Sequence, residues 1–105
     1  MPTNHILAAC QSSCYCILTE GTNDPSIVLP RLLDALKVVS PECHANIPVH
    51  SIPRDALADE THAWWCSPAA DAVILSIVLG LQRHAPEGFI FRAERDWVRL
   101  GFFPA

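Results

Sequence analysis

Cysteine and histidine are the residues of this chain with the most distinctive chemistry, with five of each among 105 residues. Both side chains bind zinc, and a structural zinc site is typically built from two close pairs of ligands, often spaced C-x2-C. That spacing is absent, because Cys10, Cys14 and Cys16 follow a C-x3-C-x-C pattern. We therefore expect no bound metal or other cofactor. If the fold does assemble a zinc site, the first candidate ligand set is Cys43, His44, His50 and Cys66.

A second candidate site is a catalytic dyad formed by Cys66 and His62. Nucleophilic catalysis by cysteine requires a thiolate and an adjacent base that activates it. Cys66 lies at the expected start of a helix, where the helix dipole favours an anion. His62 lies four residues upstream, and on a strand this even spacing places both side chains on one face. The simpler interpretation is that Cys66 is a core residue beside two tryptophans.

The motifs of other enzyme classes are missing from the sequence. It contains no G-x-S-x-G, P-loop, H-E-x-x-H or dinucleotide-binding fingerprint. No pair of carboxylates is arranged in a way that indicates general acid–base catalysis. The sequence therefore indicates no specific reaction, and a binding role is a stronger hypothesis than an enzymatic one.

The most informative element is a helix expected to begin at Pro68 and to end near His84. Ser67 before it is a favourable N-cap, and proline suits the first helical position because its missing N–H has no partner there. From Ala72 to Leu81 only one serine and one glycine interrupt the apolar residues. Such a helix has more apolar surface than one sheet of a small domain can cover, so we expect a second packing partner.

Helical periodicity divides the apolar residues of this helix into two groups. The broad face that should pack on the sheet consists of Ala70, Val73, Ile74, Ile77, Val78 and Leu81. A separate stripe consists of Ala72, Leu75 and Leu79, and beside it runs a ridge of small residues at four-residue spacing, Ala72, Ser76 and Gly80.

The small-residue ridge allows another backbone to approach closely. Glycine inside a helix costs roughly 1 kcal/mol relative to alanine, so Gly80 calls for a packing explanation. Three interpretations of the stripe are open. It packs on the first helix or beneath the segment Ser40–Asp59, it forms a symmetric homodimer, or it binds a different protein.

Trp64 and Trp65 lie in the segment Thr61–Cys66, which we expect to be a strand. Neighbouring residues of a strand point to opposite faces, so one tryptophan should lie in the core and the other on the far face of the sheet. Tryptophan is enriched at binding hot spots, so the second one either anchors a partner or is covered by a terminal segment. The candidate partner-binding residues are therefore Trp64, Trp65, Ala72, Leu75, Ser76, Leu79 and Gly80.

The first helix is expected at Pro30–Val39, and Asp24 with Pro25 offers an earlier start that would leave Pro30 as a kink. The other expected elements are a strand or hairpin at Ile6–Thr19, an edge strand at Asn46–Ile52, and a C-terminal hairpin of Phe89–Ala93 and Trp97–Phe103.

This order of elements predicts a single α+β domain covering residues 1–105. The expected architecture is a two-layer sandwich, with two helices on one face of a mostly antiparallel sheet of four to five strands. Its βαββαβ order with an added C-terminal strand is ferredoxin-like.

Composition limits the classes of partner. Half of the residues are hydrophobic, which argues against disorder, and a net charge of −4 with Lys37 as the only lysine argues against nucleic acid. The arginines near Trp97 are interspersed with carboxylates and indicate a solvated hairpin face. The longest apolar run is about ten residues, too short to span a membrane. The first residues lack the basic region of a signal peptide, so we expect a cytoplasmic protein with free thiols.

These observations favour a small acidic cytoplasmic module that works by stoichiometric protein–protein interaction. It would act as a homodimer, or as an inhibitor or adaptor of a larger assembly, in the manner of immunity proteins and phage anti-defence proteins. That comparison concerns size and charge only. The alternatives are a small thiol- or zinc-dependent enzyme that uses Cys66 and His62, and a zinc-stabilised binding module.

Overall fold

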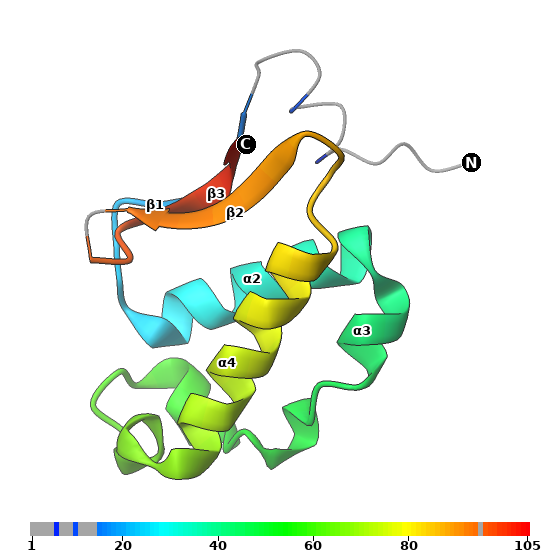
Figure 1. Ribbon diagram of the computed structural model, residues 1–105. Coiled ribbons are helices and arrows are strands. Elements are labelled where there is room, and N and C mark those ends of the chain that lie inside the picture. Colours follow the sequence, from blue (N-terminus) through cyan, green and yellow to red (C-terminus); the bar gives the residue numbers. More distant parts are fainter. Residues whose placement is uncertain (1–5, 7–9, 11–14, 95) are drawn as a thin grey trace.

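The computed structural model describes residues 6, 10, 15–94 and 96–105. Their helices and strands are β1 (Cys16–Glu20), α2 (Pro25–Val39), α3 (Pro41–Ala45), α4 (Pro68–Arg83), β2 (Phe89–Glu94) and β3 (Arg99–Pro104). Between α3 and α4 lie three short 3-10 helices, η1 (Val49–Ser51), η2 (Arg54–Ala58) and η3 (Ala63–Cys66). The strands form an antiparallel sheet in the order β1-β3-β2, which lies over α2 and α4 in Figure 1.

The fold is α+β, but the predicted ferredoxin-like sheet of four to five strands is wrong, because the described residues form a three-stranded sheet. Neither Asn46–Ile52 nor Thr61–Cys66 is a strand. The first segment contains η1, beside the prolines that cannot donate to a ladder. The second contains η3, where the Nδ1 atom of His62 accepts a hydrogen bond from the backbone N–H of Trp64 at 3.0 Å. A local side chain–backbone hydrogen bond of this kind competes with strand pairing.

Helix α2 begins at Pro25, so the earlier of the two possible starts is correct, and the expected part Pro30–Val39 is helical. Asp24 is the N-cap. Its carboxylate accepts two hydrogen bonds from Ser26, one from the backbone N–H at 2.9 Å and one from the side-chain hydroxyl at 2.6 Å. Pro30 lies inside the helix. The cap and the buried face, which includes Val28 and Leu29 in the first turns, outweigh the single N–H that Pro30 lacks.

Helix α4 has the predicted start and end. The Ser67 hydroxyl accepts a hydrogen bond from the backbone N–H of Ala70 at 3.2 Å and donates one to the Trp64 carbonyl at 2.6 Å. The predicted sheet-facing side of the helix is also confirmed, because Val73 and Ile77 are buried in the core and the other members are buried or partly buried.

The sheet buries one face against the helices. Its core side chains include Cys16, Phe91, Leu100 and Phe102, which pack with residues of α2 and α4. Ile6 and Cys10 also belong to this core. The remaining residues of the expected N-terminal strand or hairpin that precede Tyr15 lie outside the described residues.

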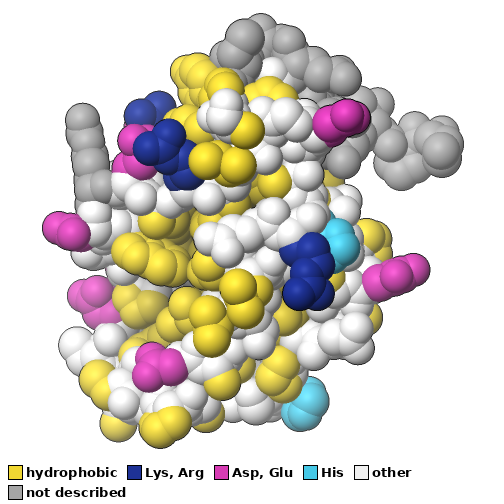
Figure 2. Space-filling view, viewed as in Figure 1, with side chains coloured by type: hydrophobic (Ala, Val, Ile, Leu, Met, Phe, Trp, Pro, Cys, Tyr) yellow, Lys and Arg dark blue, Asp and Glu magenta, His cyan; other side chains and the backbone are white. Residues whose placement is uncertain are grey.

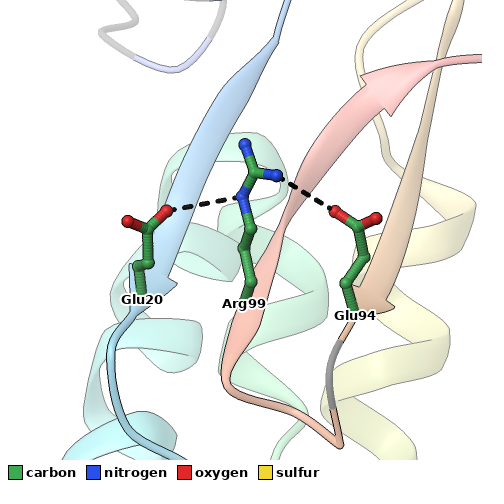
Figure 3. Close-up of polar contacts among 3 residues, drawn as sticks. All are labelled: Glu20, Glu94 and Arg99. Atoms are coloured by element: carbon green, nitrogen blue, oxygen red, sulfur yellow. Dashed lines mark hydrogen bonds and ion pairs between the residues drawn. The ribbon is translucent and has the colours of Figure 1, made fainter.

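An ion-pair ladder ties the ends of the three strands together (Figure 3). Arg99 on β3 lies between Glu20 on β1 and Glu94 on β2, at 3.4 Å and 3.5 Å. All three side chains are partly exposed, and surface pairs of this kind contribute at most about 1 kcal/mol each. The sheet is therefore held mainly by the packing of its inner face.

The centre of β3 requires glycine. Gly101 faces the irregular pairing of β1 between Ile17 and Thr19, and a Cβ atom at this position would overlap the carbonyl oxygen of Cys16. Because the obstructing atoms belong to the backbone, they cannot rotate away.

We predict that Gly101→Ala lowers the free energy of unfolding by about 3 kcal/mol, measured by urea denaturation followed by circular dichroism. Gly88→Ala is the matched control, because a Cβ there meets no atom within 4 Å and only its positive φ of 86° is unfavourable. The control should lose about 1 kcal/mol. Equal losses in the two variants would contradict this explanation of the β1–β3 contact.

Candidate functional site

Four residues of the predicted stripe and ridge form an exposed apolar surface on α4, here called the α4 stripe: Ala72, Leu75, Ser76 and Leu79. Leu75 is 57% exposed and Leu79 is 49% exposed, one helical turn apart. Neither α2 nor the segment between residues 40 and 59 buries them, so the interpretation that the stripe packs on these elements is wrong for its two leucines. Figure 2 shows hydrophobic side chains gathered over α4 and towards the β2–β3 turn.

Gly80 does not lie on this surface, although the sequence placed it there. It is buried, and a Cβ atom built on it would lie 2.7 Å from the Sγ of Cys43 on α3 and 3.0 Å from the Cδ1 of Leu36 on α2. The glycine is thus explained by close packing within the chain. Of the predicted ridge, only Ala72 and Ser76 face outward.

Ser76 adds little polarity to the α4 stripe. Its hydroxyl donates a hydrogen bond to the carbonyl of Ala72 at 2.8 Å. Because that donor is already satisfied within the helix, an apolar partner could cover Ser76 without leaving its O–H group unpaired.

Trp64 and Trp65 do not lie on opposite faces of a sheet, so that expectation is wrong. They form an edge-to-face pair on η3, with ring centroids 5.0 Å apart, and both pack against the core. The indole N–H of Trp65 donates to the carbonyls of Ala56 at 2.9 Å and Asp59 at 3.1 Å. These two residues fasten the 3-10 segment to the rest of the protein, and both are partly buried.

An apolar pocket of about 100 Å³ lies on the flank of α4 that carries Ile74. It is lined by Asn23, Pro25, Val28, Leu29, Leu32, Ile74 and Trp97, and we call it the Trp97 pocket. Pockets for drug-sized ligands measure roughly 300–1,000 Å³. The Trp97 pocket is therefore suited to a single side chain rather than to a metabolite.

Trp97 was expected at the start of a C-terminal strand, but it lies in the turn before β3 and lines this pocket, a position that the sequence did not predict. Its side chain is 38% exposed. Trp97 has a backbone φ of 73°, and the preceding Asp96 has a φ of 54°. Such conformations cost about 1–3 kcal/mol for a non-glycine residue. The turn is held by hydrogen bonds from the backbone N–H of Gly21 to the Val98 carbonyl at 3.0 Å and from the Asn23 amide to the Asp96 carbonyl at 3.4 Å. The sequence did carry one sign of this turn: the expected hairpin turn contains no glycine or asparagine, so other residues must adopt the positive φ angles that such turns require.

The structure does not support the proposed dyad geometry. His62 and Cys66 flank a 3-10 helix rather than sharing one face of a strand. The Nδ1 of His62 already accepts the N–H of Trp64, so this nitrogen is not available to take a proton from a thiol. Cys66 itself is exposed rather than packed in the core.

The candidate zinc ligands are not brought together. Among residues 6, 10, 15–94 and 96–105, no three side chains of histidine, cysteine, aspartate or glutamate gather closely enough to hold a metal ion. Cys43 lies near Gly80 towards the C-terminal end of α4, whereas Cys66 precedes the N-terminus of the same helix. Cys14 lies outside the described residues.

The four described cysteines are free thiols in two different environments. Burial raises the pKa of the Cys10 thiol, and the neighbouring Cys16 raises it further. Burial also raises the pKa of the Cys16 thiol. Cys66 is exposed, and Cys43 is partly buried.

Comparisons of the chain with protein-family models, curated proteins and solved structures found no match. In the described part of the chain, no helix combines the length and the hydrophobicity needed to cross a membrane. The function must therefore be inferred from the surface of the molecule itself.

A double-mutant cycle tests the contact at Gly80. Gly80→Ala should gain helix propensity yet lower the free energy of unfolding by about 1 kcal/mol, because the new Cβ meets the Sγ of Cys43. In a Cys43→Ala background the same change should be about 1 kcal/mol less unfavourable. An identical cost in both backgrounds, measured by urea denaturation, would show that Gly80 does not pack against Cys43.

Thiol labelling tests the two cysteine environments. With iodoacetamide at neutral pH and peptide mapping, Cys66 should react first among the four described cysteines. Cys10 and Cys16 should react only on unfolding, because they are buried and their raised pKa values disfavour the thiolate. Labelling of Cys66 at the rate of a free cysteine peptide would agree with a passive exposed thiol. A rate far above that of the peptide would instead revive the enzyme hypothesis.

Proposed function

We propose that this protein is a small acidic cytoplasmic module that acts by stoichiometric binding to another polypeptide through the α4 stripe. The observation that carries the proposal is the exposure of Leu75 and Leu79 side by side in the middle of a helix whose other face is core. Contiguous apolar surface on a protein normally marks an interaction site. The binding mode is either self-association or the docking of an inhibitor or adaptor on a larger assembly.

The size of the surface suits such a role. Complete burial of a leucine side chain contributes about 1.5–3 kcal/mol, so covering the exposed parts of Leu75 and Leu79 contributes a few kcal/mol. The Trp97 pocket, reached along the flank that carries Ile74, offers an adjacent place for one side chain of a partner. A buried anchor in a pocket beside a helix face is a common arrangement at protein interfaces.

The enzymatic alternative has less support. His62 and Cys66 lie at the two ends of a 3-10 helix instead of sharing one face of a strand, and the candidate zinc ligands lie apart. The net charge of −4 speaks against nucleic acid as the partner. No observation on the described residues favours the zinc-stabilised module over a binding module without metal.

Site-specific photo-crosslinking tests the proposal. A photoreactive amino acid replaces Gln82, an exposed α4 residue near the stripe, and the protein is irradiated in the cells that naturally produce it. We expect one discrete covalent adduct with a polypeptide. The adduct should disappear when Leu75→Glu and Leu79→Glu are introduced, because two charges would have to be buried at the interface.

Leu57→Glu is the matched control, because Leu57 is also exposed, at 40%, but lies on η2. It should leave the adduct unchanged. Circular dichroism should show that the doubly substituted protein remains folded. Absence of any adduct from the unsubstituted chain, an adduct that survives in the Leu75→Glu/Leu79→Glu variant, or unfolding of that variant would refute the proposal.

A further inference from the structure

We propose that the free edge of β2 binds an extended segment of another polypeptide as an added antiparallel strand. This surface is separate from the α4 stripe, so the inference goes beyond the proposed function and does not depend on it. In the sheet order β1-β3-β2, strand β2 lies at an edge and pairs with β3 on one side (Figure 1). In the described part of the chain, no strand pairs with its other side.

The backbone groups of β2 face β3 and the free edge alternately, as in every antiparallel pair. The N–H of Ala105 donates to the carbonyl of Gly88 at 2.9 Å, and the pairing of β2 with β3 continues from there in regular register. Residues at even spacing from Gly88 therefore direct their N–H and C=O groups to β3. Phe91 and Ala93 lie at odd spacing, so their N–H and C=O groups point to the free edge.

A further hydrogen bond agrees with this orientation. The N–H of Phe89, at the same parity as Phe91 and Ala93, donates to the carbonyl of Pro86 at 2.9 Å and not to β3. Among the described residues, no backbone group bonds to Phe91 or Ala93 from the free side of the strand. Two donors and two acceptors are thus presented in the arrangement that an extended chain pairs with.

The edge of β2 is also unprotected. Edge strands are commonly blunted by bulges, prolines or inward-pointing charges. All six residues of β2 pair with β3 without a shift in register, its sequence contains no proline, and its two charged residues lie on the outer face. At the opposite edge of the sheet, β1 has irregular pairing between Ile17 and Thr19, which makes it a poorer template.

The outer-face side chains of β2 define the chemistry of the bound segment. Ile90 is 43% exposed, and Arg92 is exposed two residues later on the same face. The Arg92 guanidinium lies 6.0 Å from the centroid of the Phe103 ring, and it takes no part in the ion pairs of the described residues. An antiparallel strand places one residue directly opposite each of these side chains. The segment should therefore carry an acidic residue opposite Arg92 and, two positions later, an apolar residue opposite Ile90.

The test is an NMR titration of the ¹⁵N-labelled full chain with the capped hexapeptide Thr-Thr-Glu-Thr-Val-Thr. This probe places its glutamate opposite Arg92 and its valine opposite Ile90. The amide signals of Phe91 and Ala93 should shift saturably, and at nine-tenths saturation their hydrogen exchange should slow by about tenfold, because only the free fraction exchanges. The amides of Ile90 and Arg92 already bond to β3, so their exchange should change little.

Two N-methylated peptides provide a matched control. Methyl groups on the nitrogen atoms of the second and fourth residues, which face β2, should abolish the saturable shifts. Methyl groups on the nitrogen atoms of the third and fifth residues, which face away, should preserve them. Arg92→Glu should weaken binding of the probe by about fivefold, and a peptide with lysine in place of the glutamate should recover that loss.

The outcomes are decided at the level of single amides. Absence of saturable shifts at Phe91 and Ala93, or equal effects of the two N-methylated peptides, overturns the inference. Slow exchange of the Phe91 and Ala93 amides in the free protein, equal to that of Ile90 and Arg92, also overturns it, because the edge would then already be covered. The crosslinking from Gln82 reports on the α4 stripe, so its result and this one stand or fall separately.

Discussion

The close contact of Gly80 with α2 and α3 determines which face of α4 is buried and which face is exposed to solvent. With no side chain at Gly80, α4 approaches Leu36 and Cys43 until their side chains occupy the space of a Cβ atom. This contact sets the rotation of α4 about its axis. Because successive residues are separated by roughly 100°, placing Gly80 inward turns Leu79 by about 100° and Leu75 by about 140° away from that contact, towards solvent.

The small sheet explains why α4 has an uncovered face. In the described part of the chain, three strands cover one side of the helices, and the segment between α3 and α4 forms short 3-10 helices instead of further strands. Trp65 fastens that segment near the N-terminus of α4 through its hydrogen bonds to Ala56 and Asp59. None of these elements covers the α4 stripe, so the protein keeps an apolar surface that a partner can use.

The sequence predicted the elements with strong local signals. Ser67 and Pro68 mark the start of α4 with a cap and a suitable first residue, and helical periodicity identified its buried face. The strands of the C-terminal hairpin were also anticipated, with small differences at their ends. The strands predicted at Asn46–Ile52 and Thr61–Cys66 are wrong because they were assigned from residue type alone. In the second segment, the hydrogen bond that His62 accepts from the backbone favours a 3-10 helix, and the hydrophobic pattern carries no sign of that bond.

The candidate site was predictable only in part. Periodicity placed Leu75 and Leu79 together on one stripe, but it gives angles around a helix and not the identity of the neighbours. Gly80 was therefore assigned to the outer surface, although α2 and α3 approach it. Trp97 was missed because its exposure depends on the left-handed backbone of a turn held by Gly21 and Asn23, which are distant in the sequence.

The most direct test of this account is an NMR measurement of contacts made by the methyl groups of Leu36, Leu75 and Leu79 in the native protein. The account predicts intramolecular contacts between the Hα protons of Gly80 and the methyl groups of Leu36, and none from the methyl groups of Leu75 and Leu79 to α2 or α3. Intramolecular contacts from the methyl groups of Leu75 and Leu79 to α2 or α3 would contradict it.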